Sequence, residues 1–210
     1  MTLGEKQLGI WRGDFGNAYI ERNQATAERV RQRVAAFASI LPHLAGAPAA
    51  SILEVGANIG LNLRALAGLT GAVLHAVEPN RQAREILIAE SVLPVERVHD
   101  ATAAALPMAD ASFDLVFTST VLIHVPDEAL AAAMREIHRV SRRWILCMEY
   151  FSPVAQTITY RGHGDLLFKR DYGGLWLDGF PDLEYVADGF FWKRTTGLDD
   201  VNWWLFRKSH

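Results

Sequence analysis

The segment 51–60, SILEVGANIG, restricts the fold more than any other part of the chain, because a short apolar strand runs into a turn with two glycines and then into a helix. Gly56 and Gly60 let a ligand approach the backbone, and the helix start offers unpaired N–H groups. A dinucleotide fingerprint would need glycines where Asn58 and Leu61 stand, and a P-loop would need a lysine. The turn therefore favours a nucleoside without a pyrophosphate.

The rest of the chain alternates strands and helices, which predicts a parallel sheet with helices on both faces. We expect residues 155–182, rich in glycine, to form a loop-rich insertion. The segment 201–208 is apolar on both faces and belongs inside the sheet. The predicted helices are 24–44, 59–68, 80–91 and 127–140, and the predicted strands are 51–54, 72–80, 95–98, 114–118, 144–148, 183–194 and 201–208.

An acidic residue lies near the end of the second predicted strand, at the distance expected for a nucleoside site. Glu78 ends AVLHAVE, about twenty residues after Gly56. A carboxylate there can accept hydrogen bonds from both ribose hydroxyls. Alternatively, the glycines only shape the turn and Glu78 only caps the next helix.

Residues 51–150 resemble a class I S-adenosylmethionine (SAM)-dependent methyltransferase. EVGANIG is similar to its glycine motif, VEPN to its acidic second motif, and DATAAALPMADASFDLVFTSTVLIHV to its third and fourth motifs. The resemblance implies a Rossmann-like α/β fold with a seven-stranded, mostly parallel sheet and an antiparallel C-terminal strand. It also implies a SAM site: Glu54, Gly56, Ala57, Asn58 and Gly60 near the methionine part, Glu78 and Pro79 near the ribose, Asp100 and Ala101 near the adenine, and Thr118 and Ser119 lining the pocket.

The whole chain is similar, more narrowly, to the pseudaminic acid biosynthesis-associated methylases. The segments WRGDFGNAYIERN at 11–23 and FFWKRTTGLDDVNWWLFRK at 190–208 carry this resemblance. The name of that family reflects genetic association, so the resemblance implies SAM binding more strongly than a sugar substrate.

We expect a single domain with an N-terminal helical lid at 1–45, a SAM-binding core at 46–150, and a substrate-side loop with a C-terminal hairpin at 151–210. In the lid, Tyr19 can stabilise the sulfonium cation, and Arg22 or Asn23 can hold a carboxylate. The aromatics of this segment can instead only attach the first helix to the core.

The candidate catalytic residues lie near the carboxyl ends of the predicted strands: His124, Glu149, Tyr150 and Tyr160. We predict methyl transfer to a sugar-like or amino-acid-like small molecule. One alternative is cyclisation of SAM to azetidine-2-carboxylate with release of methylthioadenosine. A third is a module that binds SAM or S-adenosylhomocysteine without catalysis.

Composition narrows the partners and the location. The net charge of −3 and the absence of a long basic run argue against a nucleic-acid partner. No stretch is long and apolar enough to suggest a membrane span, and the single cysteine suits a reducing cytoplasm. The histidine spacing matches no standard metal site, so we predict no metal. The oligomeric state stays open.

Overall fold

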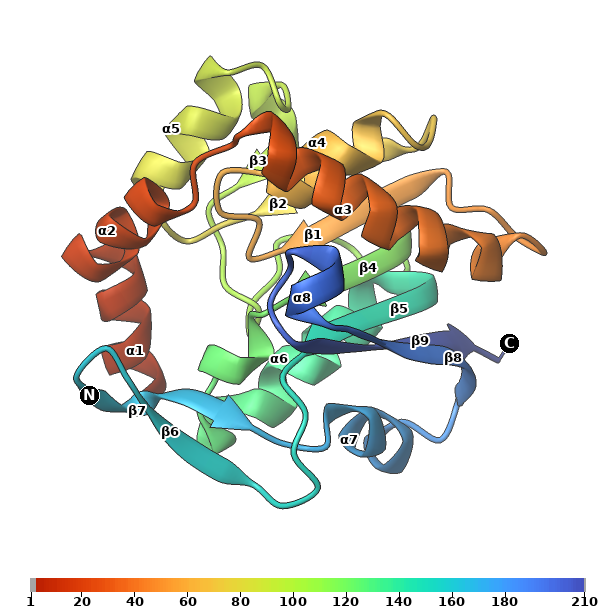
Figure 1. The fold of residues 1–210 in the computed structure, drawn as a ribbon. Helices are drawn as coiled ribbons and strands as arrows, with labels where there is room; N and C mark the ends of the chain where they lie inside the picture. Colours follow the sequence, from red (N-terminus) through yellow and green to blue (C-terminus); the bar gives the residue numbers. More distant parts are fainter. Residues whose placement is uncertain (1–2, 210) are drawn as a thin grey trace.

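The computed structural model describes residues 3–209, except for the side chains of His163 and Asp165, and it is built on a seven-stranded sheet (Figure 1). The strand order is β3-β2-β1-β4-β5-β9-β8. β9 runs antiparallel to both of its neighbours, while β1 to β5 pair in parallel. The predicted fold class is therefore confirmed. The strands are β1 (Ser51–Val55), β2 (Val73–Val77), β3 (Val98–His99), β4 (Phe113–Ser119), β5 (Ser141–Glu149), β8 (Leu183–Phe191) and β9 (Val201–Lys208).

Helices cover both faces of this sheet, because neighbouring residues of a strand point to opposite sides. On one face, Phe117 of β4 packs in a core that α3, α4 and α5 close. On the other, Val116 packs in a second core under α6 and α7. The helices are α3 (Ala27–Ile40), α4 (Leu61–Ala67), α5 (Arg81–Ala89), α6 (Asp127–Val140) and α7 (Tyr172–Gly179).

The strand order reverses between β1 and β4, since the chain adds β2 and β3 on one side of β1 and β4 and β5 on the other. In open α/β sheets, ligands bind beyond the carboxyl ends of the strands at such a reversal. Two short helices, α1 (Leu3–Arg12) and α2 (Asp14–Arg22), lie beside the carboxyl ends of these strands, at the left of Figure 1.

The segment 155–182 is more ordered than predicted. It contains the antiparallel hairpin of β6 (Gln156–Tyr160) and β7 (His163–Lys169), followed by α7. Two glycines begin α7 for a packing reason: a Cβ at Gly173 would come within 2.5 Å of the Trp204 indole nitrogen, and one at Gly174 within 2.6 Å of the capping Asp171. The glycines that suggested a loop therefore permit close packing of a helix.

The predicted last hairpin is present, with a short helix α8 (Lys193–Thr196) between β8 and β9.

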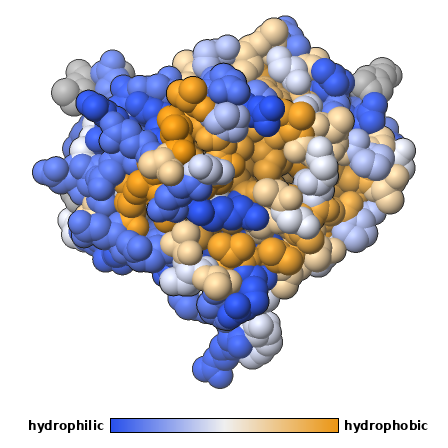
Figure 2. Space-filling model, turned by 90° about the horizontal axis from the view of Figure 1, so that it is seen from above, coloured by the Kyte–Doolittle hydropathy of each residue, from blue (hydrophilic) through white to orange (hydrophobic). Residues whose placement is uncertain are grey.

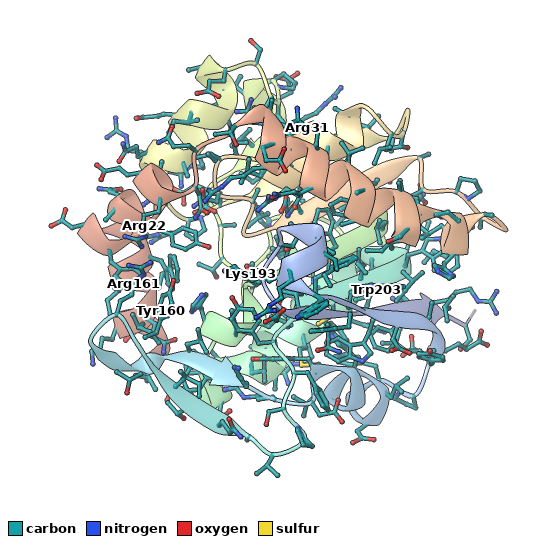
Figure 3. All side chains as sticks on the ribbon, in the orientation of Figure 1. Arg22, Arg31, Tyr160, Arg161, Lys193 and Trp203 are labelled. Atoms are coloured by element: carbon teal, nitrogen blue, oxygen red, sulfur yellow. The ribbon has the colours of Figure 1, made fainter. Side chains whose placement is uncertain are left out.

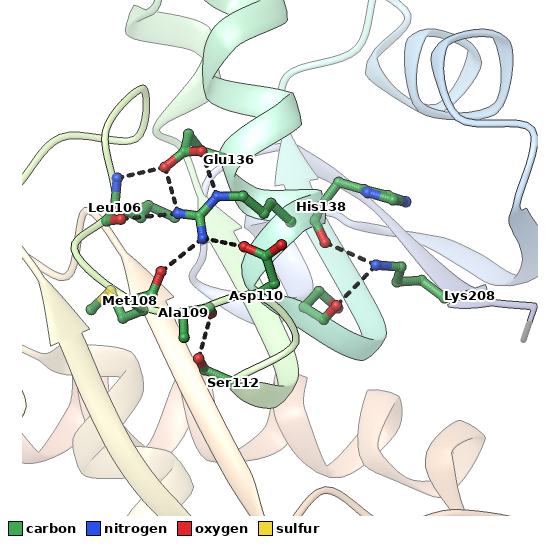
Figure 4. Close-up of polar contacts among 10 residues, drawn as sticks. Leu106, Met108, Ala109, Asp110, Ser112, Glu136, His138 and Lys208 are labelled. Atoms are coloured by element: carbon green, nitrogen blue, oxygen red, sulfur yellow. Dashed lines mark hydrogen bonds and ion pairs between the residues drawn. The ribbon is translucent and has the colours of Figure 1, made fainter.

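Arg139 holds the loop before β4 against its own helix, α6. Its guanidinium donates to Glu136, to Asp110 and to the carbonyls of Leu106 and Met108 (Figure 4). The loop that leads into β4 is therefore tied to the helix behind it.

The surface seen from above is divided. Hydrophilic side chains dominate the left of this view, and hydrophobic ones gather over its centre and right (Figure 2). Within residues 3–209, no helix has the length and apolar character needed to cross a membrane.

Candidate active site

A cavity of about 420 Å³ opens at the strand reversal between β1 and β4. Its floor comes from the turns after β1, β2 and β4, and its cover comes from α1 and α2. Pockets of this size hold one small molecule. The lid predicted for the N-terminal segment thus borders the same cavity as the glycine turn.

The turn after β1 takes the left-handed conformations that its sequence suggested. Gly56, Asn58 and Gly60 have φ values of 79°, 48° and 75°. The backbone N–H of Asn58 donates to one carboxylate oxygen of Glu78 at 2.7 Å, and the backbone N–H of Asn80 donates to the other at 2.8 Å. Burial raises the pKa of the Glu78 carboxyl to about 7. Glu78 therefore braces the turn and lines the cavity at the same time.

A second buried carboxyl lies in the cavity at the end of β1. One oxygen of Glu54 accepts a hydrogen bond from the Asn62 amide at 2.7 Å, and the other is buried without a partner among the described residues. Burial raises the pKa of Glu54 to about 8. Arg33 of α3 also lines the cavity and interacts electrostatically with Glu54. A ligand carrying both an ammonium and a carboxylate would find a partner for each here.

Aromatic rings of the lid form a cluster at the cavity. The Trp11 ring contacts Phe15 and Tyr19 edge-on, each with 5.3 Å between centroids. Trp11 and Tyr19 line the cavity together with Asn23, whose amide donates to the Tyr19 carbonyl. The faces of such rings suit a cationic ligand.

His124 stands at the other side of the cavity, in the 3-10 helix η3 (Leu122–His124) after β4. Its Nδ1 contacts the Leu166 carbonyl of β7, which assigns the proton to Nδ1 and leaves Nε2 as the acceptor. Trp11 packs against the imidazole with 4.7 Å between centroids. Burial lowers the pKa of His124 to about 4, so the ring is neutral.

Most of the residues predicted to bind the cofactor line this cavity. They are Tyr19, Asn23, Glu54, Gly56, Ala57, Asn58, Glu78, Pro79, Ala101 and Ser119.

The other four predicted cofactor residues do not line it. Asp100 pairs with Arg84 at 2.7 Å and with Arg12 at 3.3 Å on the outside of the lid. Arg22 stacks over the rings of Phe15 and Tyr19, and Figure 3 shows it near Tyr160 and Arg161. Thr118 is buried within the sheet. At Gly60, a Cβ would meet Leu87, so this glycine serves packing against α5.

Three of the four predicted catalytic residues also lie elsewhere. Glu149 accepts hydrogen bonds from the amides of the residues that begin η3, Val121, Leu122 and Ile123, at 3.1–3.2 Å. Its carboxylate is fully committed to this helix start, so the prediction that it holds an acceptor does not fit. Tyr150 donates to Asp199 at 3.2 Å, outside the cavity lining.

Tyr160 does not line the cavity, but its ring packs against the imidazole of His124. Its ring lies 5.6 Å from the imidazole and 6.1 Å from Phe15, between centroids. The tip of the β6–β7 hairpin thus contacts both the lid and η3.

Several polar residues of the cavity were missed from sequence, and Arg33 and Asn80 are two of them. Arg33 lies one turn from Val30 and Phe37, on the face of α3 that packs inward, so its position in an apolar stripe was the available signal. Asn80 follows Glu78 by two residues, at the first position of the helix predicted for 80–91, and its side chain caps α5. Their side chains enter the site only because of the packing of α3 and the lid.

A doubly wound sheet, a glycine turn at the strand reversal and an acid at the end of β2 define a nucleoside-binding enzyme of Rossmann-like architecture. Residues 53–144 match a family described as a methyltransferase domain. The chain is 31% identical over 156 residues to a dimethylglycine N-methyltransferase of Parasynechococcus marenigrum (strain WH8102), covering 72% of this chain and 52% of that protein. The chain thus spans about half the length of this curated relative.

Solved methyltransferases share the fold. The 1,6-didemethyltoxoflavin-N1-methyltransferase of Burkholderia thailandensis, solved with 1,6-didemethyltoxoflavin and S-adenosylhomocysteine, has a TM-score of 0.72 at 19% identity, covering 100% of this chain and 92% of its own. The magnesium protoporphyrin IX methyltransferase of Synechocystis PCC 6803, solved with SAM, has a TM-score of 0.71 at 12% identity, covering 100% and 98%. Residues 53–144 thus form a methyltransferase domain, and the fold around them is that of the class I SAM-dependent methyltransferases.

The residues of the cavity fit the cofactor of this class. The buried oxygen of Glu54 that has no partner among residues 3–209 is suited to a cation such as the α-ammonium of SAM. Glu78 lies at the end of β2, where a ribose would be held. These comparisons do not separate the narrower methylase family from other members of the class, so that resemblance stays a prediction.

Proposed function

We propose that this protein transfers the methyl group of SAM to a small-molecule acceptor. The observation that carries the proposal is the single cavity that brings Glu54 and Glu78 together with His124 under the lid. When bound, SAM supplies a methyl group activated by a sulfonium. In-line displacement then depends mainly on alignment and on the exclusion of water.

The side chains divide the work between cofactor and acceptor. Glu78 holds the ribose hydroxyls, Glu54 the α-ammonium and Arg33 the carboxylate. Trp11 and Tyr19 cover the site and exclude water. His124 accepts the acceptor's proton at Nε2, because its Nδ1 proton is directed to Leu166.

The charges of the cavity favour one kind of acceptor. Its lining carries three carboxyls, Glu5, Glu54 and Glu78, and Arg33 is the one guanidinium or ammonium group in the described lining. If Arg33 holds the SAM carboxylate, an acceptor with several negative charges has no cationic partner in this lining. We therefore favour a small amino-acid-like amine over an acceptor with several negative charges. The matched relative is a methyltransferase of dimethylglycine, itself a small amine.

One observation favours a second candidate, the cyclisation of SAM as substrate. Glu54, with a pKa of about 8, can take a proton from the α-amine that it faces. The freed nitrogen would then attack the γ-carbon. The N–Cγ bond forms, the Cγ–S bond breaks, and its electron pair stays on the sulfur of methylthioadenosine.

Incubation with SAM and mass spectrometry separate these functions. We expect no turnover with SAM alone, and S-adenosylhomocysteine plus a methylated product once glycine, sarcosine or dimethylglycine is added. Methylthioadenosine and azetidine-2-carboxylate from SAM alone would overturn methyl transfer in favour of cyclisation. Binding without turnover in an extended acceptor panel would support a module that only binds SAM.

Because the described residues contain no membrane-spanning helix and Cys147 is free, we place the protein in the cytoplasm.

A further inference from the structure

Asn80 joins the predicted ribose site to the lid through one buried side chain. It is 3% exposed and lies at the start of α5, two residues after Glu78. Its amide NH₂ donates to the Trp11 carbonyl at 2.9 Å and to the Asn17 side chain at 3.0 Å. Its side-chain oxygen accepts from the Ala83 amide at 3.0 Å and so caps α5.

The lid needs such an attachment because its helices are short. α1 has ten residues and α2 has nine, each with glycine in its interior, and isolated helices of this length are marginal in water. Trp11 is in the last turn of α1, where carbonyls lack a partner within the helix. The Asn80 amide supplies a donor at that end.

Gly16 of α2 shows how closely the lid fits onto this side chain. A Cβ at this position would lie 2.8 Å from the Asn80 amide nitrogen and would overlap the Trp11 carbonyl. Both lid helices therefore meet at Asn80.

The same side chain is connected to the catalytic side. The Trp11 carbonyl bonds to Asn80, while the Trp11 ring packs on His124. The Asn80 backbone amide donates to Glu78. A displacement of the lid at Asn80 would therefore move the ring that covers the imidazole.

We propose that Asn80 is a positioning residue that couples cofactor binding at Glu78 to closure of α1 and α2 over the site. The inference rests on the proposed function for its ligand, but the attachment of the lid exists in the free protein. Occupation of Glu78 stabilises the start of α5, and the docked lid in turn encloses the bound cofactor.

Asn80→Asp tests the coupling with little change of shape. Aspartate keeps the oxygen that caps α5, but it directs an oxygen toward the Trp11 carbonyl and the Asn17 side-chain oxygen. Asn80→Ser is a second, uncharged cap that is too short to reach the lid. The matched control is Asp171→Ser, which replaces the cap of α7 on the other face of the sheet.

The first readout is hydrogen exchange of the amides of residues 3–22 in the free protein. We expect faster exchange there in both Asn80 variants, unchanged exchange in β1 and β4, and no effect of Asp171→Ser on the lid. The second readout is calorimetric titration with SAM, where we expect the Kd to rise about tenfold in both variants. Asn17→Ala, which removes one of the two lid partners, should show a smaller rise.

Wild-type exchange in the lid and wild-type affinity in both Asn80 variants would overturn the inference. Faster exchange spread over the whole chain, with Asn17→Ala unchanged in affinity, would also overturn it, because Asn80 would then act only on folding. If the wild-type protein binds no SAM, the proposed function fails, whereas the exchange of residues 3–22 still decides whether Asn80 anchors the lid.

Discussion

At the scale of single residues, the site depends on two carboxyls whose pKa values burial raises to near pH 7–8. Glu54 and Glu78 are 2% and 7% exposed, and burial raises the pKa of each. An unpaired charge in such a place is costly, so both side chains favour a ligand that brings a cation or hydrogen-bond donors. His124 is the counterpart, an imidazole that burial keeps neutral.

Replacing Glu78 should weaken cofactor binding. We expect Glu78→Gln to reduce the binding free energy of SAM by about 1–3 kcal/mol, because hydrogen bonds from the ribose to a charged acceptor are lost. Calorimetry measures this, with Glu85→Gln on the exposed side of α5 as the control. An unchanged affinity in Glu78→Gln would remove the ribose from this position.

Replacing His124 should affect turnover more than binding. We expect His124→Gln to lower kcat by about 10²- to 10⁴-fold with little change in the Kd for SAM, as for the loss of a general base. Because its pKa is about 4, wild-type kcat should persist on the acid side until the pH approaches that value. The exposed His43 provides the control, His43→Gln. A kcat that already falls near pH 6.5 would contradict a buried, neutral His124 as the base.

At the scale of elements, the catalytic side is assembled from three segments that meet at η3. The carboxylate of Glu149, at the end of β5, accepts from the amides that begin η3. The Leu166 carbonyl of β7 orients the ring of His124, the last residue of η3. The strand end and the hairpin therefore position the imidazole without touching a substrate.

The role of Glu149 is testable as a matter of stability. We expect Glu149→Ala to lower the free energy of unfolding by about 1–3 kcal/mol in urea titrations, since buried amides lose their acceptor. Glu149→Gln, which keeps one acceptor oxygen, should cost less. Full stability together with lost turnover in Glu149→Ala would return this residue to the catalytic role predicted from sequence.

At the scale of the whole molecule, the two cores and the loops around them determine stability. Arg139 binds α6 to the loop before β4 (Figure 4). Its hydrogen bonds lower the pKa of Glu136 to about 2, below the usual 4.5. A carboxyl whose pKa is depressed by folding stabilises above its unfolded pKa, and this contribution is lost as the pH falls through the folded value.

Acid titration should expose this contribution. We expect the difference in unfolding free energy between wild type and Glu136→Gln to be full above about pH 4.5 and to shrink as the pH falls toward 2. Chemical unfolding at several pH values measures it, with the exposed Glu96→Gln as the control. A difference independent of pH would show that the Glu136 charge contributes nothing to the native state.

The sequence alone determined the sheet, the glycine turn and the acid after β2, because strand periodicity, left-handed turns and strand ends are local properties of consecutive residues. Asn58 is an example: asparagine tolerates the positive φ that the turn requires. The sequence also predicted that β9 lies inside the sheet, because Trp203 and Phe206 are apolar side chains on its two faces, and both are buried.

Only the tertiary structure decided which polar side chains enter the cavity. Glu149 and Arg33 both stand in apolar segments, yet one caps a neighbouring helix while the other reaches the ligand site. Asn80 stands at the start of the predicted helix 80–91, and only the structure shows that its side chain both caps α5 and attaches the lid. The direction and partners of a side chain depend on elements far away in sequence, and no local pattern encodes them.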